Sequence, residues 1–285
     1  MSGPFHRRAL FVTAAGGLAI AGAWVALGAF RAVPLEPPRP SPTYEDAIAR
    51  VDAIRSREGP DVNPLCRTRV LGAGRRTERV VVLLHGFTNC PKQFDSLAAD
   101  LSRRGVNVLV PRIPRHGMAD RMSPALRLLT AEELTRAGEE AVDIAHGLGE
   151  RVTVVGLSSS AVLAGWLAQH RPDVDGAVLL APSFAPRGMP GAIARRLTGA
   201  LLRSPNFFVW WDRRLRAGLP GPRQCYPRFA SRGLAEVYRL GYSLLDDAAR
   251  GAPAAKRLTV VTTTGDEGVN NDLTADLARR WRARG

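Results

Sequence analysis

The sequence predicts an α/β protein built on a doubly wound, mostly parallel sheet. Five short apolar runs, rich in β-branched residues, have the length and composition of strands buried in such a sheet. The runs are residues 80–84, 106–110, 152–155, 177–180 and 258–262. The segments between the first four have helical periodicity, so strands and helices alternate. The chain has 285 residues, of which 45% are hydrophobic, and this suffices for one large folded domain.

The N-terminus carries an apolar run that is long enough to cross a membrane. Residues 9–30 contain no charged side chain and would extend roughly 33 Å as a helix. His6, Arg7 and Arg8 precede this run. We therefore expect residues 1–33 to be an uncleaved signal anchor, with a long cleaved signal peptide as the alternative. Both place the rest of the chain outside the cytoplasm, either anchored to the membrane or exported.

Residues 34–43 are rich in proline and predict a semi-rigid linker between this run and the folded domain. Thr43 and Asp46 then form a plausible capping arrangement for a short amphipathic helix. Its apolar positions recur at helical spacing and are Tyr44, Ile48, Val51 and Ile54. We expect residues 44–285 to be the folded domain.

The formal charge of +14 does not predict nucleic-acid binding. The arginines are scattered in pairs along the chain, and no stripe of interleaved basic and aromatic residues occurs in the sequence. This charge favours an anionic membrane surface as a partner. The sequence contains no metal-ligand cluster and predicts no cofactor.

The three cysteines give an indication of the compartment. Cys66 and Cys90 flank the first predicted strand, and an exported domain could oxidise them to a disulfide, which leaves Cys225 free. Three unrelated thiols are the alternative.

Three consecutive serines follow the strand 152–155, and one of them has the surroundings of a nucleophile. A sharp turn from strand to helix exposes a serine when the residues two before and two after it are small. Ser158 meets this condition, because Gly156 and Ser160 flank it. For each of the other two serines, one flanking position carries a bulkier side chain. A serine-rich helix N-cap is the alternative interpretation.

Three motifs at the ends of predicted strands resemble the α/β-hydrolase superfamily. They are Leu84-His85-Gly86-Phe87, the segment 111–117 and Gly156-Leu157-Ser158-Ser159-Ser160. From about residue 80 onwards the chain is most similar to the group of esterases, monoacylglycerol lipases and serine aminopeptidases. The resemblance implies an oxyanion hole made of the backbone N–H groups of Phe87 and Ser159. It also implies that His85 and His116 have structural roles.

The resemblance also implies a catalytic triad, in which an acid and a histidine base assist Ser158. The sequence offers a candidate for the acid but none for the base. Asp266 follows the last predicted strand at the position that the resemblance implies for the acid, with Glu267 as the alternative and a solvated loop carboxylate as a third interpretation. In this fold the histidine follows the acid, yet all five histidines precede Asp266. We therefore find no catalytic histidine, and we expect the sheet to lack its final strand. Truncation is the preferred explanation, ahead of a loss of catalysis or recruitment of an upstream histidine.

The long segment of about 183–256 is expected to form a helical cap over the site. Its aromatic cluster, 207–211, could line an acyl pocket, pack the cap onto the body, or enter a membrane interface. The sequence thus predicts a membrane-tethered serine hydrolase for carboxylic esters or lipids, inactive as given if the histidine is truly absent. A non-catalytic protein that binds an apolar ligand on the same fold is the alternative.

Overall fold

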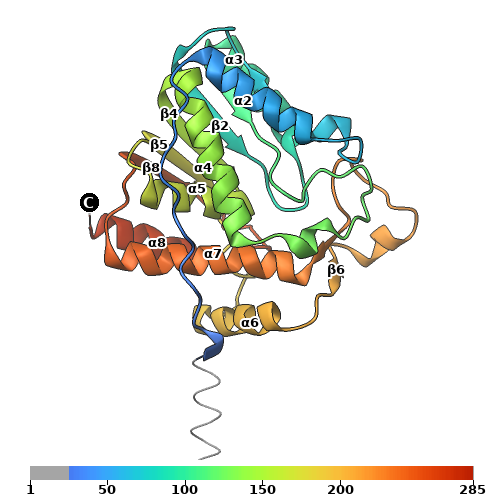
Figure 1. The fold of residues 1–285 in the computed structure, drawn as a ribbon. Helices are drawn as coiled ribbons and strands as arrows, with labels where there is room; N and C mark the ends of the chain where they lie inside the picture. Colours follow the sequence, from blue (N-terminus) through green and yellow to red (C-terminus); the bar gives the residue numbers. More distant parts are fainter. Residues whose placement is uncertain (1–25, 285) are drawn as a thin grey trace, which may run out of the picture.

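The computed structural model describes residues 26–284, which form a central sheet between layers of helices (Figure 1). In this part of the chain the main sheet has six strands in the order β1-β3-β2-β4-β5-β8. Strand β1 is antiparallel to β3, and every other pair is parallel. The strands are β1 (Arg69–Leu71), β2 (Thr77–Leu84), β3 (Asn107–Val110), β4 (Gly149–Leu157), β5 (Gly176–Leu180) and β8 (Arg257–Val261). The predicted doubly wound, mostly parallel sheet is confirmed.

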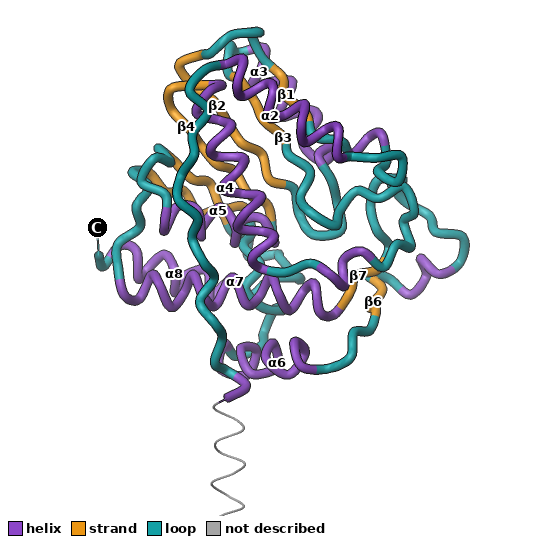
Figure 2. The backbone as a smooth tube through the Cα atoms, viewed as in Figure 1, coloured by secondary structure: helices purple, strands orange, loops and turns teal. Residues whose placement is uncertain are grey.

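Most of the helices cover one face of the sheet (Figure 2). The helices are α2 (Tyr44–Arg57), α3 (Asp95–Arg103), α4 (Ala131–Leu148), α5 (Ser159–His170), α6 (Gly191–Arg203), α7 (Ser231–Arg250) and α8 (Asn271–Arg282). Helices α4 and α5 pack directly on the sheet, while α2 packs on α4 and α7 packs on α5. The main core lies between these layers and includes the fully buried Trp166 of α5. Thr43 caps α2 by accepting a hydrogen bond from the N–H of Asp46, as the sequence predicts.

The opposite face of the sheet is covered less completely. Helix α3 packs over β1 and β3 and closes a smaller core of Leu83, Phe94, Ala98, Val108 and Val110. On β4 and β5 the residues that alternate with buried ones are only half-buried, and on β8 alternate residues are exposed. Among the described strands β8 pairs with β5 alone, so β8 is an edge strand.

The proline-rich segment is attached to the domain, although the sequence predicts a spacer there. The backbone N–H of Glu36 donates to the Glu139 carboxylate at 2.8 Å, and that of Arg39 donates to Asp143 at 3.0 Å. Both acceptors are buried on α4, and Val33 is buried beside them in the core. Residues 33–41, the N-terminal strap, therefore run along α4 from the α6 end of the molecule to the start of α2 (Figure 1).

The predicted signal anchor or signal peptide lies mostly outside the described residues, which begin at residue 26. Within residues 26–284, no helix has both the length and the apolar character that a membrane crossing requires.

The segment predicted as a cap contains two different parts. Helix α6 and a small antiparallel sheet of β6 (Phe208–Trp210) and β7 (Arg228–Ala230) lie at the edge of the body. Helix α7 instead belongs to the body, because a buried stripe along it packs on α5. The side chain of Leu244 lies so close to Gly165 of α5 that a Cβ there would be 2.8 Å from it. The cap is thus shorter than the sequence predicts.

Candidate active site

A sharp turn joins the end of β4 to the start of α5 and presents Ser158. The backbone of Ser158 has φ 56° and ψ −111°, a conformation that costs a non-glycine residue free energy. A Cβ on Gly156 would lie 2.0 Å from the carbonyl oxygen of Ser160. Only glycine fits at position 156, because the two backbone segments nearly touch there. The local geometry is that of a nucleophile elbow, with Ser158 at its apex.

Hydrogen bonds to the segment after β5 hold this elbow in place. The N–H of Ser158 donates to the carbonyl of Leu180 at 2.8 Å, and the carbonyl of Ser158 accepts from the N–H of Ser183 at 3.1 Å. The side chain of Ser158 is half-buried. Its hydroxyl forms no hydrogen bond with any residue in the described part of the chain, so it is free to meet a substrate or a base.

The loop after β2 lies beside the elbow, because Leu84 of β2 pairs with Gly156 of β4. The hydroxyl of Ser160 donates to the carbonyl of His85 at 2.5 Å and joins the two segments. On the other side of the loop, the N–H of Gly86 donates to the side-chain oxygen of Gln93 at 2.8 Å. These two bonds fix the loop of residues 85–87 relative to Ser158.

Two backbone N–H groups, one in the loop of residues 85–87 and one at the start of α5, have no partner within residues 26–284. The N–H of Phe87 donates to no group within residues 26–284, and Ser159 is the first residue of α5, where helical N–H groups lack intrahelical acceptors. The positive end of the α5 dipole lies at the same place. The arrangement can stabilise a negative charge that develops on a carbonyl oxygen held beside Ser158.

The two histidines near the elbow form hydrogen bonds with the backbone. His85 accepts from the N–H of Ile113 at its Nε2 atom, and its Nδ1 atom lies 3.1 Å from the carbonyl of Gly86. The Nδ1 atom of His116 lies 2.8 Å from the carbonyl of Pro114. Burial is the main cause that lowers the pKa of His85 well below its usual value and that of His116 to about 4. Both rings are therefore neutral at pH 7 and shape the loops around the site.

No histidine within residues 26–284 bonds to Ser158. His146 bonds to Asp173 at 3.0 Å, and His170 bonds to Asp247 at 3.2 Å. The Nε2 atom of His116 is buried without a hydrogen-bond partner, and its ring packs against Phe87 instead. In the described chain the turn at Ser158 and the loop of residues 85–87 therefore lie together, and no imidazole bonds to Ser158.

Asp266 lies in the loop that follows β8, at the same end of the sheet as Ser158 and two strands away. Its carboxylate accepts from the N–H groups of Gly268 at 2.8 Å and Val269 at 3.1 Å. The side chain is partly exposed, and Glu267 beside it is exposed. The structure thus brings Asp266 to the sheet end that carries the elbow, while one carboxylate oxygen also holds its own loop.

A disulfide joins Cys66 to Cys90. Cys90 is the N-cap of the short 3₁₀ helix Pro91–Phe94, which follows the loop of residues 85–87. Gly117 packs against this bridge with φ +70°, and a Cβ on it would lie 2.6 Å from the Cβ of Cys66. Cys225 is free and half-buried in the cap, where burial raises the pKa of its thiol. The bridge therefore ties the segment Pro64–Cys66 to the segment that follows residues 85–87.

The cap is hydrogen-bonded to Thr88, which directly follows the loop of residues 85–87 and has φ 62°. The indole N–H of Trp211 donates to the Thr88 hydroxyl at 2.9 Å, and the N–H of Tyr226 donates to the Thr88 carbonyl at 2.8 Å. The ring of Phe229 packs between Trp211 and Phe87. Trp211 therefore joins the cap to the body although its side chain is 54% exposed, and Phe207 of the same predicted cluster is 51% exposed.

Sequence reasoning did not find Thr88, Gln93 or Tyr226 as residues that shape the site. Tyr226 also accepts from the N–H of Met118 and donates to the carbonyl of Arg115, so it joins the cap to the loop of His116. No local sequence pattern marks these residues, because each acts through partners that are distant along the chain.

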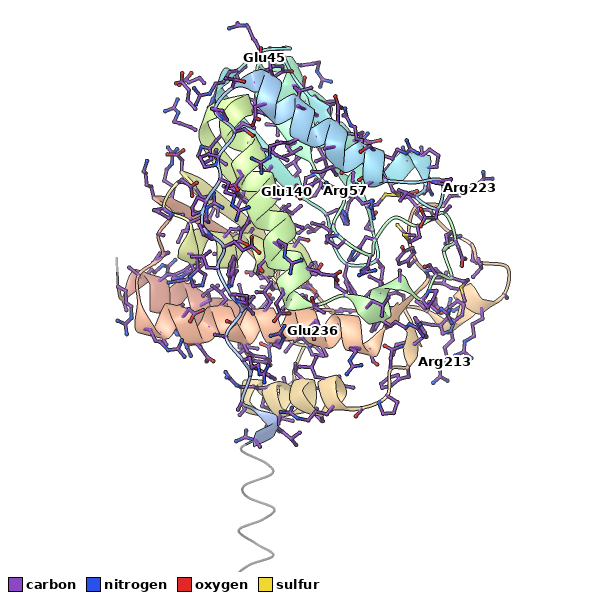
Figure 3. All side chains as sticks on the ribbon, in the orientation of Figure 1. Glu45, Arg57, Glu140, Arg213, Arg223 and Glu236 are labelled. Atoms are coloured by element: carbon purple, nitrogen blue, oxygen red, sulfur yellow. A yellow bond between two sulfur atoms is a disulfide. The ribbon has the colours of Figure 1, made fainter. Side chains whose placement is uncertain are left out.

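A cavity of about 610 Å³ lies away from Ser158, between α2, α4 and the loop after β3. Arg57 of α2 and Glu140 of α4, both labelled in Figure 3, belong to its lining and form an ion pair at 3.5 Å. Within residues 26–284, no group of three or more histidine, cysteine or acidic side chains is placed to hold a metal ion.

A parallel sheet with a strained serine at its strand-to-helix turn, beside two unpartnered backbone N–H groups, defines a protein of the α/β-hydrolase class. Residues 81–285 match the alpha/beta hydrolase family, and the chain belongs to it.

The relatives include lipases. A thermostable monoacylglycerol lipase of Bacillus sp. (strain H-257) is 32% identical over 119 residues, which is 42% of this chain and 45% of that protein. The chain thus matches less than half the length of this curated relative.

Two solved structures share the fold. The monoacylglycerol lipase of Paleococcus ferrophilus aligns with a TM-score of 0.56 and 18% identity over 75% of this chain and 83% of that one. A soluble variant of the Saccharomyces cerevisiae monoglyceride lipase, in complex with a substrate analogue, aligns with a TM-score of 0.56 and 15% identity over 75% and 77%.

Proposed function

We propose that this hydrolase cleaves carboxylic esters with Ser158 as nucleophile. The observation that carries the proposal is the position of Ser158 at a strained elbow beside the free N–H groups of Phe87 and Ser159. Attack of the Ser158 oxygen on an ester carbonyl would place the developing negative charge where these two donors meet. Asp266, at the same end of the sheet, is the proposed acid. Lipid esters are the proposed substrate class, because lipases are among the relatives.

The proton of Ser158 needs an acceptor, and the described residues supply no imidazole for it. Activity then depends on an imidazole from outside these residues, and the chain as given should hydrolyse esters barely above background. Removal of one triad member costs several orders of magnitude in rate, while the oxyanion hole retains a residual effect.

Exogenous imidazole tests this proposal directly. We expect the chain to hydrolyse p-nitrophenyl acetate faster in the presence of added imidazole, by more than the reaction of imidazole itself. The Ser158→Ala variant should lose this gain, and Ser159→Ala, which keeps its backbone N–H, should retain it. An equal gain in the parent chain and in Ser158→Ala would refute a nucleophilic role for Ser158. Strong hydrolysis without imidazole that His116→Ala abolishes would instead assign the base to His116.

Within residues 26–284 no imidazole bonds to Ser158, and this favours one alternative, a non-catalytic protein that holds an apolar ligand on this fold. A fluorophosphonate probe separates the two, because covalent labelling requires an activated serine. Imidazole-dependent labelling of Ser158 supports the hydrolase. Saturable binding of a fluorescent fatty acid without any labelling supports the alternative.

We further propose that the domain is tethered to a membrane and lies outside the cytoplasm. The uncharged run of residues 9–30 supports the tether, and the bond between Cys66 and Cys90 supports an oxidising compartment. Retention of the intact chain in the membrane fraction after alkaline carbonate extraction tests the tether. Recovery of the uncleaved chain in the soluble fraction would refute it.

A further inference from the structure

Residues 26–30, the part of the uncharged run that the structure describes, pack against α6. The guanidinium of Arg195 donates to the carbonyl of Gly28 at 2.6 Å, and that of Arg203 donates to the carbonyl of Ala26 at 3.3 Å. The backbone carbonyl of Leu27 passes so close to Gly199 that a Cβ there would lie 1.7 Å from it. Residues 26–30 are therefore held against α6 by contacts that leave room for no side chain at position 199.

Phe30 and the N-terminal strap fix the direction of the chain beyond this point. The ring of Phe30 stacks on Tyr242 of α7 with 6.0 Å between centroids, and the Arg195 guanidinium lies 5.3 Å from the Phe30 centroid. The strap then continues along α4 through its bonds to Glu139 and Asp143. Because residues 26–41 are attached along their length, the place where the uncharged run meets the domain is fixed relative to α6.

The outward side of α6 carries exposed apolar side chains. Ile193 and Leu197, one helical turn apart, are each 44% exposed, while Ala194 and Thr198 on the inner side are buried. Two exposed branched aliphatic side chains at this spacing form a stripe along the helix. Such a stripe on a short surface helix is typical of a segment that meets a lipid surface.

Basic residues border this stripe, and α6 has no acidic residue. The arginines of α6 and of the segments beside it are Arg31, Arg195, Arg196, Arg203 and Arg232. Asp246 of α7 pairs with Arg195, while α6 itself carries three arginines and no acidic residue. The charge is complementary to anionic phospholipid headgroups.

We propose that α6 rests on an anionic lipid bilayer, the same one that residues 9–25 enter, with Ile193 and Leu197 in the interfacial layer. This inference rests on the proposed membrane tether. It adds a second contact and therefore an orientation, in which the α6 end faces the lipid and the end with α2 and α3 points away (Figure 1). Helix α6 follows Ser183 along the chain, and the N–H of Ser183 donates to the carbonyl of Ser158 in the elbow.

Site-specific fluorescence in the full chain tests this orientation. In a Cys225→Ser background, Ile193→Cys and Leu197→Cys are labelled with the environment-sensitive dye NBD. Leu97→Cys is the matched control, because Leu97 is an apolar residue of α3 that is 40% exposed at the other end of the molecule. The labelled chains are reconstituted into vesicles of equal parts phosphatidylcholine and phosphatidylglycerol that carry spin-labelled lipid.

We expect the dye at positions 193 and 197 to be quenched by the spin-labelled lipid at least about threefold more strongly than at position 97, with a blue-shifted emission. For the double variant Ile193→Asp/Leu197→Asp, the dye is placed at a third outward position, Ala200→Cys. The two aspartates should remove most of the quenching by spin-labelled lipid. Equal quenching at positions 193, 197 and 97 in protein that carbonate does not extract would overturn the docking of α6 and leave the tether intact. Extraction of the protein by carbonate would overturn both the docking of α6 and the membrane tether. The imidazole-dependent hydrolysis of p-nitrophenyl acetate by the same samples reports on the enzyme proposal independently of either result.

Discussion

The hydroxyl of Ser160 donates to the carbonyl oxygen of His85 across 2.5 Å and joins the elbow to the oxyanion loop. The two backbone donors of the proposed oxyanion hole, at Phe87 and Ser159, belong to these two segments. Ser160 occupies the last position of the elbow motif, where glycine is usual. The serine therefore fits the tight turn and also sets the separation of the two donors.

Replacement of Ser160 by alanine should destabilise the fold by about 1–3 kcal/mol, because a buried carbonyl loses its donor. Chemical denaturation measures this loss. Ser159→Ala is the control, since the Ser159 hydroxyl forms no hydrogen bond within residues 26–284, and its stability should change by less than half as much. Equal losses in the two variants would show that the bond of Ser160 contributes nothing specific.

Replacement of Gly156 by alanine should be more damaging, because the added methyl group would lie 2.0 Å from the Ser160 carbonyl. Relief of this overlap requires a backbone shift at the elbow and should cost about 3 kcal/mol or more. Thermal unfolding of the variant gives the size of the effect. Gly176→Ala in β5 is the matched control, since the nearest atom to its new methyl group is 3.6 Å away. A Gly156→Ala protein with the parental melting temperature would contradict the close approach.

Loss of the bond between Cys66 and Cys90 should lower the free energy of unfolding by about 3 kcal/mol, because the bridge closes a loop across a sequence separation of 24. The double variant Cys66→Ser/Cys90→Ser, compared with Cys225→Ser by denaturation, measures this loss. In the exported protein, thiol reagents should reach Cys66 and Cys90 only after reduction and unfolding. Equal labelling with and without reductant would show that the bridge is absent.

The free energy of unfolding should decrease as the pH is lowered from 6.5 to 4, because burial lowers the pKa of His116 from 6.5 to about 4. In this interval the unfolded chain binds a proton at His116 that the folded protein does not bind, so unfolding becomes easier as the pH falls. The contribution is full above pH 6.5 and amounts to about 3 kcal/mol at most.

Denaturation curves at several pH values test this dependence. His116→Gln should flatten the change in stability between pH 4 and pH 6.5 and run parallel to the parent protein above pH 7. His85 titrates in the same direction and should leave part of the slope in the variant. An unchanged slope in His116→Gln would mean that the buried ring does not contribute to acid sensitivity.

The features that the sequence predicts well depend on local sterics or on burial along a single strand. The apolar runs that become β2, β3, β4, β5 and β8 are recognisable because strands of a parallel sheet are buried by neighbouring elements. The elbow at Ser158 follows from the size of Gly156 and Ser160 alone. Strand β1 escaped prediction because Arg69–Leu71 is short and mixes a charged residue with apolar ones.

The features that the sequence does not predict depend on partners that are distant along the chain. The proline-rich residues resemble a spacer, but the N–H of Glu36 finds its acceptor on Glu139, 103 residues away. Thr88 meets Trp211 across a separation of 123 residues. No periodicity in one segment contains such information, because it arises only when the folded layers come together.

Strand β8 determines how copies of this protein behave toward one another. Its outer row of backbone N–H and C=O groups pairs with no described strand, and such an edge is a template for the strand of another molecule. Arg257 places positive charge at the beginning of this edge, where Lys256 is paired with Asp175, whereas exposed Val261 lies at its other end. Repulsion between these charges keeps two edges apart at low ionic strength, and salt screens it. The colloidal stability of the isolated chain should therefore decrease as salt is added.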